Sequence, residues 1–219
     1  DGLSGETDVL SRYALFNSVR YTYDAGSFWA GVSVDELEGT NVGSYRVVGA
    51  ANVVENDNNV GITAGIGGKV GGAKLQLIGG YDVDQEEGAV RLIATADFGP
   101  GTLGLAGVWA SGGNAYYNQS EWAVAAEYAI KATDKLTITP GAQWFGNVAT
   151  TASLSSTALS GATTLRLADD FSDRDAWQAG VTVDYKITQG LSAKITANYF
   201  DEDERDDQVN GFVRLQRSF

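Results

Sequence analysis

Apolar and polar residues alternate with a period of two along most of this chain. From Trp177 to Ile187, the odd-numbered positions hold Trp, Ala, Val, Val, Tyr and Ile, whereas the even-numbered positions hold Gln, Gly, Thr, Asp and Lys. The segment from Leu191 to Phe200 repeats the pattern, and only Thr188-Gln189-Gly190 separates the two. A period of two places alternate side chains on opposite faces of a β-strand. The pattern therefore predicts two amphipathic strands joined by a tight hairpin.

The same test predicts eleven strands in the whole chain. They are expected at residues 12–24, 27–37, 59–70, 73–83, 88–98, 102–111, 120–131, 136–147, 176–187, 190–201 and 208–219. Their connections alternate between short turns and long loops. The short turns are 25–26, 71–72, 99–101, 132–135 and 188–190, and the long loops are roughly 36–58, 84–88, 112–119, 148–175 and 202–207. Short turns on one rim and long loops on the other are typical of an all-β, antiparallel, up-and-down transmembrane barrel.

Composition favours the same fold class. The 219 residues include 28 glycines, ten tyrosines and five tryptophans but two prolines, which is typical of an aromatic-rich β protein and compatible with a single domain over residues 1–219. No run approaches the ~18 consecutive apolar residues of a transmembrane helix. A closed barrel is the other way to satisfy backbone groups in lipid. The Ala-, Ser- and Thr-rich stretch from 149 to 164 is expected to be a mobile external loop.

Charge is concentrated in the predicted long loops. Segments 35–58, 82–88, 166–175 and 201–207 contain nineteen of the 28 acidic residues but only four arginines, Arg46, Arg166, Arg174 and Arg205. Such a rim could attract divalent cations or concentrate cationic solutes. The acidic residues considered are Asp84, Glu86, Glu87, Asp201, Glu202, Asp203, Glu204, Asp206 and Asp207. No defined metal site is readable, because the DEDERDD spacing lacks the glycine turn of an EF-hand loop; the alternative is a merely solvated acidic rim.

Aromatic residues lie on the apolar face, most of them near a predicted strand end. They are Tyr21, Tyr23, Phe28, Tyr81, Phe98, Trp122, Tyr128, Trp144, Trp177, Tyr185, Tyr199 and Phe219. Amphipathic rings favour the headgroup level of a bilayer, so two girdles are predicted. The alternative, a soluble core lined by aromatic residues, does not explain why smaller residues lie between the two ends.

Several segments resemble the porin family of alphaproteobacteria. They are NSVRYTYDAGSFWAGVSV at 17–34, residues 60–68, AKLQLIGGYDVD at 73–84, residues 89–97 and GFVRLQRSF at 211–219, where Phe219 resembles the closing signal of an outer-membrane barrel. The resemblance covers most strand regions but not the long loops. It implies a trimeric, water-filled, sixteen-stranded barrel in the outer membrane of a Gram-negative bacterium, surrounded by lipid and lipopolysaccharide.

The strand count raises an expectation about the amino-terminal region. A single-chain bacterial barrel normally has an even number of strands. If the last of eleven strands ends at the short-turn rim, the first strand begins at the long-loop rim. Residues 1–11 are then expected to be the end of an external or inward loop. The resemblance then implies that five strands and most of the third external loop, which narrows the channel in general porins, are missing.

Nine charged residues are predicted to line the lumen, because a charged side chain facing lipid near the midplane costs roughly 2–4 kcal/mol. They are Arg20, Lys69, Lys74, Arg91, Asp97, Glu127, Asp184, Lys194 and Arg214. Arg20, Arg91 and Arg214 are expected to form part of a basic wall that produces a transverse field. The alternative for any one of them is a solvated lumen residue without a role.

The function predicted is passive diffusion of small hydrophilic solutes and ions through a homotrimeric porin. The alternative is a substrate-selective channel or a structural or adhesin barrel; small outward residues such as Ala64, Gly68, Ala94 and Ala96 are compatible with a subunit contact. An enzyme is not expected, since the chain has no histidine and no cysteine for the usual nucleophilic chemistry. No cofactor is predicted, and a net charge of −13 opposes binding to nucleic acid.

Overall fold

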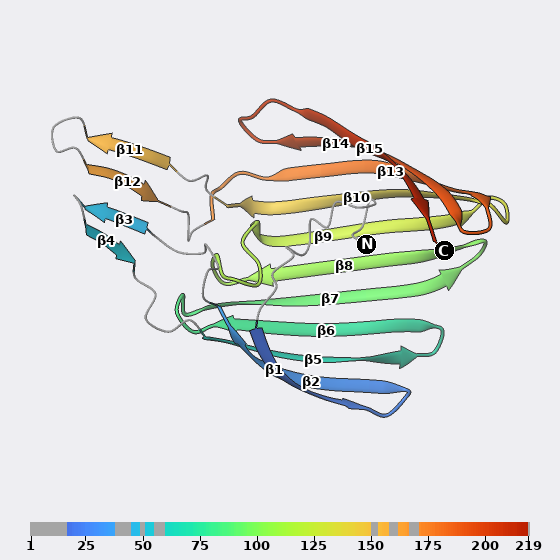
Figure 1. Ribbon diagram of the computed structural model, residues 1–219, viewed down its shortest axis with the longest axis horizontal. Coiled ribbons are helices and arrows are strands. Elements are labelled where there is room, and N and C mark those ends of the chain that lie inside the picture. Colours follow the sequence, from blue (N-terminus) through green and yellow to red (C-terminus); the bar gives the residue numbers. More distant parts are fainter. Residues whose placement is uncertain are drawn as a thin grey trace.

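Eleven antiparallel strands pair in chain order to form one large sheet (Figure 1). The structure, a computed structural model, describes residues 17–37, 45–48, 51–54, 60–149, 153–157, 162–166 and 171–218. The strands of the large sheet are β1 (Asn17–Asp24), β2 (Phe28–Glu36), β5 (Val60–Val70), β6 (Ala73–Asp82), β7 (Glu87–Phe98), β8 (Gly101–Ala110), β9 (Ser120–Lys131), β10 (Leu136–Val148), β13 (Ala176–Thr188), β14 (Leu191–Glu202) and β15 (Gln208–Arg217). The predicted fold class and the eleven strands are confirmed.

The strand ends agree with the alternation of short and long connections. Four of the short turns contain a glycine with positive φ, namely Gly26, Gly71, Gly99 and Gly190. Glycine adopts this conformation without the steric cost that a side chain would bring, which fixes tight turns at one rim. Residues 1–16 and Phe219 lie outside the described residues, so the predictions for residues 1–11, for the first part of strand 12–24 and for Phe219 stay predictions.

Two of the long connections contain strands that the sequence pattern did not predict. The first carries β3 (Tyr45–Val48) and β4 (Ala51–Val54), and the second carries β11 (Ser153–Thr157) and β12 (Ala162–Arg166). These strands form a four-stranded sheet in the order β11-β12-β3-β4, with Leu165 opposite Tyr45. The expected external loop from 149 to 164 thus includes β11 and most of β12, and β12 pairs with a connection more than a hundred residues earlier in the chain. Figure 1 shows this small sheet beyond the long-loop rim.

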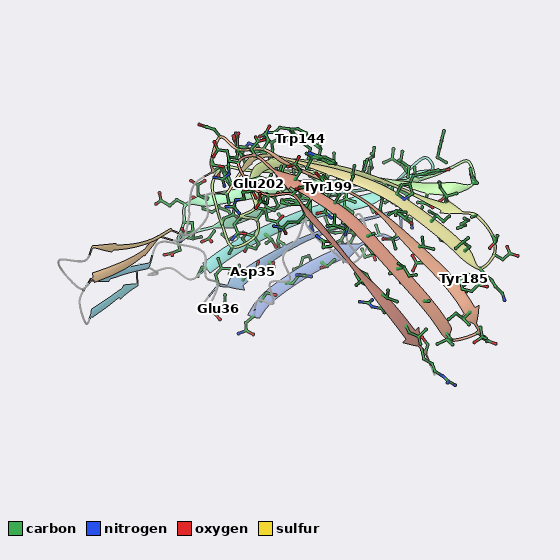
Figure 2. The ribbon with its side chains drawn as sticks, turned by 90° about the horizontal axis from the view of Figure 1, so that it is seen from above. Asp35, Glu36, Trp144, Tyr185, Tyr199 and Glu202 are labelled. Atoms are coloured by element: carbon green, nitrogen blue, oxygen red, sulfur yellow. The ribbon has the colours of Figure 1, made fainter. Side chains whose placement is uncertain are left out.

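The large sheet is arched rather than flat (Figure 2). Asp35, Glu36 and Glu202 lie toward one end of the strands, and Tyr185 lies toward the other, as the alternation of strand directions requires. Strands β1 and β15 form the two edges of the sheet. Among the described residues, none belongs to a helix with the length and hydrophobicity needed to cross a membrane.

Candidate functional site

The two faces of the arched sheet differ sharply in chemistry. Residues paired across an antiparallel ladder share a face, so the register carries each assignment from strand to strand. One face, here called the outward face, exposes large apolar side chains: Val19, Ile62, Leu92, Val124, Ile195 and Val213 are all at least half exposed. The opposite, inward face carries polar side chains, including buried Ser33, Gln143, Gln178, Thr182 and Asn198. An apolar outward face is suited to contact with lipid, and a polar inward face is suited to a water-filled interior.

Hydrogen bonds connect polar side chains across the inward face. The hydroxyl groups of Thr182 and Thr196 lie 2.9 Å apart, and those of Ser33 and Thr63 lie 2.5 Å apart. The amide of Asn198 donates to Asn210 Oδ1 at 3.3 Å. Each pair joins side chains on different strands, so the polar face is partly satisfied by its own cross-strand contacts.

All nine residues predicted to line the lumen fall on the inward face by register. Lys69 lies opposite Lys74, and Asp97 lies opposite Thr102, whose hydroxyl donates to the Asp97 carboxylate at 2.8 Å. Asp184, Lys194 and Arg214 form one row across β13, β14 and β15. The full set on this face is Arg20, Lys69, Lys74, Arg91, Asp97, Glu127, Asp184, Lys194 and Arg214.

The structure brings some of these charges together and separates others. Lys194 Nζ lies 3.6 Å from Asp184 Oδ1, and the guanidinium of Arg214 lies 5.8 Å from the centre of the Phe212 ring. Arg20, Arg91 and Arg214 lie on β1, β7 and β15, so the predicted basic wall is not a contiguous patch on the described sheet. Its three arginines share a face, and their joint role stays a prediction.

Aromatic side chains on the outward face gather toward the two rims. At the short-turn rim, the rings of Tyr23 and Phe28 lie 5.9 Å apart. At the long-loop rim, Trp177 and Tyr199 lie 5.3 Å apart, and Trp144 projects from the convex side in Figure 2. Trp109, which is half exposed and directly opposite Trp122, extends the set that the sequence analysis named. The arrangement agrees with two girdles at headgroup level.

One long connection folds onto the inward face. We call residues 111–119 the inner loop. Its turn is built around Asn114, which is 1% exposed: Oδ1 accepts hydrogen bonds from the backbone N–H groups of Tyr116 and Tyr117, both at 3.0 Å, and Nδ2 donates to Gly112 O at 2.9 Å. An asparagine that satisfies backbone groups in this way fixes a turn. The inner loop therefore has a defined internal conformation.

Two carboxylates fasten the inner loop to the sheet. Asp82, 2% exposed, accepts the backbone N–H of Ala115 at 3.0 Å and also the N–H groups of Asp84 and Gln85 at 3.1 and 3.2 Å. Asp35, 4% exposed, accepts the Tyr116 hydroxyl at 2.8 Å. The sequence analysis counted Asp35 and Asp82 within the acidic rim. Both lie at the long-loop ends of their strands, as expected, but they are buried and accept hydrogen bonds instead of facing solvent.

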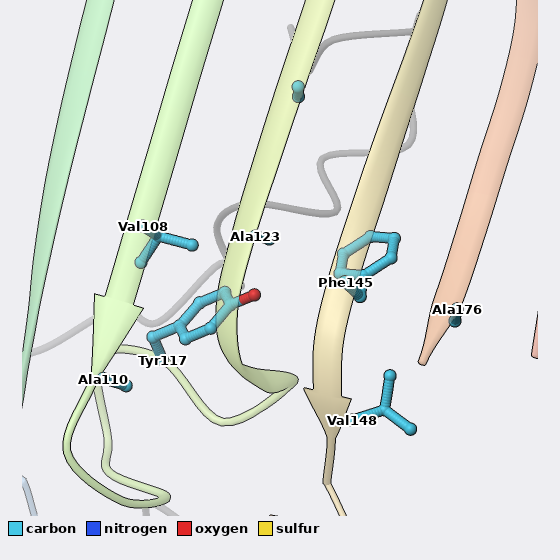
Figure 3. Packing of buried hydrophobic residues seen from close by; sticks show 8 residues of the cluster. Val108, Ala110, Tyr117, Ala123, Phe145, Val148 and Ala176 are labelled. Carbon is cyan, nitrogen blue, oxygen red and sulfur yellow. The ribbon is translucent and has the colours of Figure 1, made fainter. Parts of the chain in front are cut away.

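The side chain that follows Tyr116 fixes the other end of the loop. Tyr117 is buried in a cluster with Val108, Ala123 and Phe145 on the inward face of β8, β9 and β10 (Figure 3). Its hydroxyl lies 2.7 Å from Ser120 Oγ. Adjacent tyrosines thus point to different strands: Tyr116 reaches β2, and Tyr117 packs on β8 to β10. Nothing in the local sequence pattern indicates this, because the contact between Tyr116 and Asp35 spans 81 positions.

Burial changes the acidity of both loop tyrosines. Burial, the hydrogen bond to Asp35 and the negative charges of Asp35 and Asp82 raise the pKa of Tyr116 well above its usual range. Burial raises the pKa of Tyr117 to about 12, against a smaller opposing effect of its hydrogen bond with Ser120. Both phenols therefore favour the folded loop while they are protonated.

The resulting pH dependence can be measured. A pKa raised by folding contributes stability that is complete below the ordinary phenol value of about 10 and is lost as the pH rises through the raised value. The hydrogen bond to Asp207 also raises the pKa of Tyr199. We therefore expect a spectrophotometric titration at 295 nm to show a group of phenols that ionise late, Tyr116 and Tyr117 among them, and Tyr116→Phe to remove the latest of them. A titration of Tyr116→Phe that matches the parent above pH 11 would contradict the assignment.

At the other side of the long-loop rim, Glu202 holds two arginines. Its Oε1 lies 3.1 Å from Arg174 Nη2 and 3.0 Å from Arg205 Nε. Its neighbours in the predicted divalent-cation group have partners of their own: Asp201 accepts the indole N–H of Trp177 at 3.1 Å, and Asp203 accepts the N–H of Asp175 at 3.0 Å. Within the described ranges, no group of three or more acidic side chains converges as a metal site requires.

The fold and its two faces define a class of protein: the wall of an up-and-down transmembrane β-barrel, apolar toward lipid and polar toward a lumen. The chain belongs to the porin subfamily, which it matches over residues 1–216. Membership in this family places it in the outer membrane.

Two curated relatives agree with this assignment. Outer membrane protein IIIA of Rhizobium leguminosarum bv. viciae is 47% identical over 220 residues, covering 97% of this chain and 55% of that protein. A putative outer membrane protein of Sinorhizobium fredii is 40% identical over 221 residues, covering 100% of this chain and 55% of that protein. The chain therefore spans about half the length of the curated relatives it matches. The resemblance to alphaproteobacterial porins is confirmed.

Solved structures show the same fold. A loop-deletion mutant of OmpT, an outer membrane protein of Vibrio cholerae, superimposes with a TM-score of 0.58 and 15% identity, covering 91% of this chain and 62% of that one. A porin refined at 1.8 Å gives a TM-score of 0.58 and 14% identity, covering 93% of this chain and 62% of that one. At these identities the likeness concerns the fold alone.

Proposed function

We propose that this chain forms much of the wall of a water-filled channel through which small hydrophilic solutes and ions diffuse passively. The observation that carries the proposal is the inward face, to which each of the eleven strands contributes polar side chains and which includes charged residues such as Arg91 and Glu127 away from the strand ends. Charges in such positions are inexpensive beside water and costly beside lipid. Diffusion needs no catalytic group and no cofactor, so the protein is proposed to be a channel rather than an enzyme.

The distribution of charge suggests how the channel treats ions. Acidic residues at the long-loop rim, including exposed Asp206 and Asp207, produce a negative potential at one mouth. Lys69, Lys74 and the row of Asp184, Lys194 and Arg214 lie nearer the short-turn rim and give the other end a positive excess. We infer moderate cation preference at low salt that weakens as ions screen the rim, since the Debye length falls from about 10 Å at 0.1 M to about 3 Å at 1 M.

The assembly is proposed to be a homotrimer in the outer membrane, in contact with lipid and lipopolysaccharide. The support is the family, together with small outward residues such as Ala64 and Ala94 that allow close approach of a neighbour.

Planar-bilayer recording of the full gene product tests the proposed function. We expect stepwise openings, grouped in threes if the channel is trimeric. We also expect the reversal potential in a KCl gradient to move toward zero as the salt concentration rises, because cation selectivity weakens. Folding is checked independently by the heat-modifiable mobility of the barrel on gels. Silent bilayers with correctly folded protein would overturn the diffusion channel and favour a structural or adhesin barrel.

A further inference from the structure

The inner loop crosses a large part of the inward face. Through Tyr116 it contacts Asp35 on β2, through Ala115 it contacts Asp82 at the end of β6, and through Tyr117 it packs on β8 to β10. Its attachment points are thus distributed over strands that are far apart in the sheet order β2-β5-β6-β7-β8-β9-β10. A loop that simply connected β8 to β9 at the rim would not need contacts with β2.

Burial shows that the loop is held against the wall rather than extended into solvent. Asn114, Ala115 and Tyr117 are 1%, 9% and 5% exposed, respectively. Between them, the Asp82 carboxylate and the Asn114 amide accept five backbone N–H groups. Asp82 accepts those of Asp84, Gln85 and Ala115, and Asn114 accepts those of Tyr116 and Tyr117. Buried polar groups with this degree of satisfaction form a rigid unit, since opening it would expose several donors at once.

The wall beneath Tyr116 lacks side chains where the ring lies. A Cβ at Gly80 would lie 2.7 Å from the Tyr116 ring, and a Cβ at Gly61 would lie 1.9 Å from its hydroxyl oxygen. Both glycines are on the inward face, because Gly61 pairs with Asp82 and Gly80 pairs with Thr63. The two positions together leave a recess that fits the tyrosine ring. Because this recess fits the Tyr116 ring, the wall glycines and the loop tyrosine together determine where the loop docks.

We propose that the inner loop is a constriction element of this channel and that Tyr116 is the residue whose docking sets the solute size limit at the long-loop mouth. The proposal rests on the proposed diffusion function. The docked loop adds backbone and side-chain volume on the lumen side of β2, β5 and β6. Hydrogen bonds hold this volume in place, so it narrows the opening at the long-loop rim. Undocking removes that fixed volume, so larger solutes pass and the ion current rises.

Gly80→Ala tests the proposal against a matched control. The added methyl group at residue 80 occupies the place of the Tyr116 ring, whereas a Cβ at neighbouring Gly79, on the outward face, meets only Ala89 O at 3.6 Å. Both substitutions add one methyl group to the same strand. We expect Gly80→Ala to raise single-channel conductance and to speed the swelling of liposomes in larger sugars. We expect Gly79→Ala to match the parent protein in both measurements.

A disulfide lock provides a second test that does not depend on disturbing the recess. Residues 1–219 contain no cysteine, so Gly80→Cys with Tyr116→Cys introduces one pair into this part of the protein. The ring carbon attached to the Tyr116 Cβ lies 2.7 Å from a Cβ placed at residue 80, which brings the two Cβ atoms within the reach of a disulfide. We expect the oxidised channel to keep the narrow conductance and addition of a reductant to raise it.

The outcomes separate this proposal from the function on which it rests. Parent channels that conduct, with Gly80→Ala and the reduced double variant both at parental conductance, would overturn the constriction and leave the diffusion channel standing. Parent channels that never open, although folded, would remove the proposed function itself. Higher conductance in Gly80→Ala and on reduction, with Gly79→Ala unchanged, supports the inner loop as the constriction.

Discussion

Leu92→Arg is expected to destabilise the folded protein in a bilayer by about 2–4 kcal/mol, because it places a charge on the lipid side near the middle of a strand. Leu92 is the sixth of the twelve residues of β7, is 50% exposed on the outward face, and lies beside Leu77 and Gly107 on the neighbouring strands. Lipid offers the guanidinium no hydrogen-bond partner at that depth. The measurement is urea unfolding of the protein folded into phospholipid vesicles, followed by tryptophan fluorescence and gel mobility.

Ile93→Arg is the matched control for this experiment. Ile93 is the next residue on the same strand, but it lies on the inward face between Gln76 and Ala106. A guanidinium at this position can extend into water, so its cost is expected to be much smaller than that at residue 92. Equal losses of stability at the two positions would show that the outward face does not contact lipid and would contradict the assignment of the faces.

Asp82→Ala is expected to release the inner loop. The substitution removes the acceptor of three backbone N–H groups, of which that of Ala115 is buried. A buried donor left without a partner costs about 1–3 kcal/mol, whereas the donors of Asp84 and Gln85, at the rim, can turn to water. The loop should therefore detach while the barrel stays folded. Limited digestion with chymotrypsin, which cuts after aromatic residues, should yield cleavage at Tyr116 or Tyr117 in the variant and protection in the parent.

Asp84→Ala controls for the loss of one negative charge at the same turn. The Asp84 side chain accepts a hydrogen bond from Gln85 Nε2 at 3.2 Å, within the turn that follows β6. We expect its digestion pattern to match the parent protein. Cleavage at the two tyrosines in Asp84→Ala as well would indicate that charge at the rim, rather than the Asp82 contacts, holds the loop.

The sequence by itself determined the strands and their faces. In a barrel wall each strand is amphipathic along its whole length, so a period of two is enough to locate β13 and β14 and to assign Asp184 and Lys194 to the polar face. The glycines at the short turns and the acidic long connections likewise depend on residues that are near one another in the chain. From these local signals, the difference between the short-turn and long-loop rims and the two aromatic girdles could be predicted.

Only the tertiary structure decided how the long connections are used. The pairing of β12 with β3 joins segments with no amphipathic alternation that could identify them as strands in isolation. Asp35 and Asp82 read as rim acids in the sequence, because charged residues in a loop normally face water. They are buried because the inner loop brings the N–H of Ala115 and the hydroxyl of Tyr116 to them, across 33 and 81 positions of chain. Strand periodicity is a local property, whereas the docking of a loop depends on a recess built by residues from other strands.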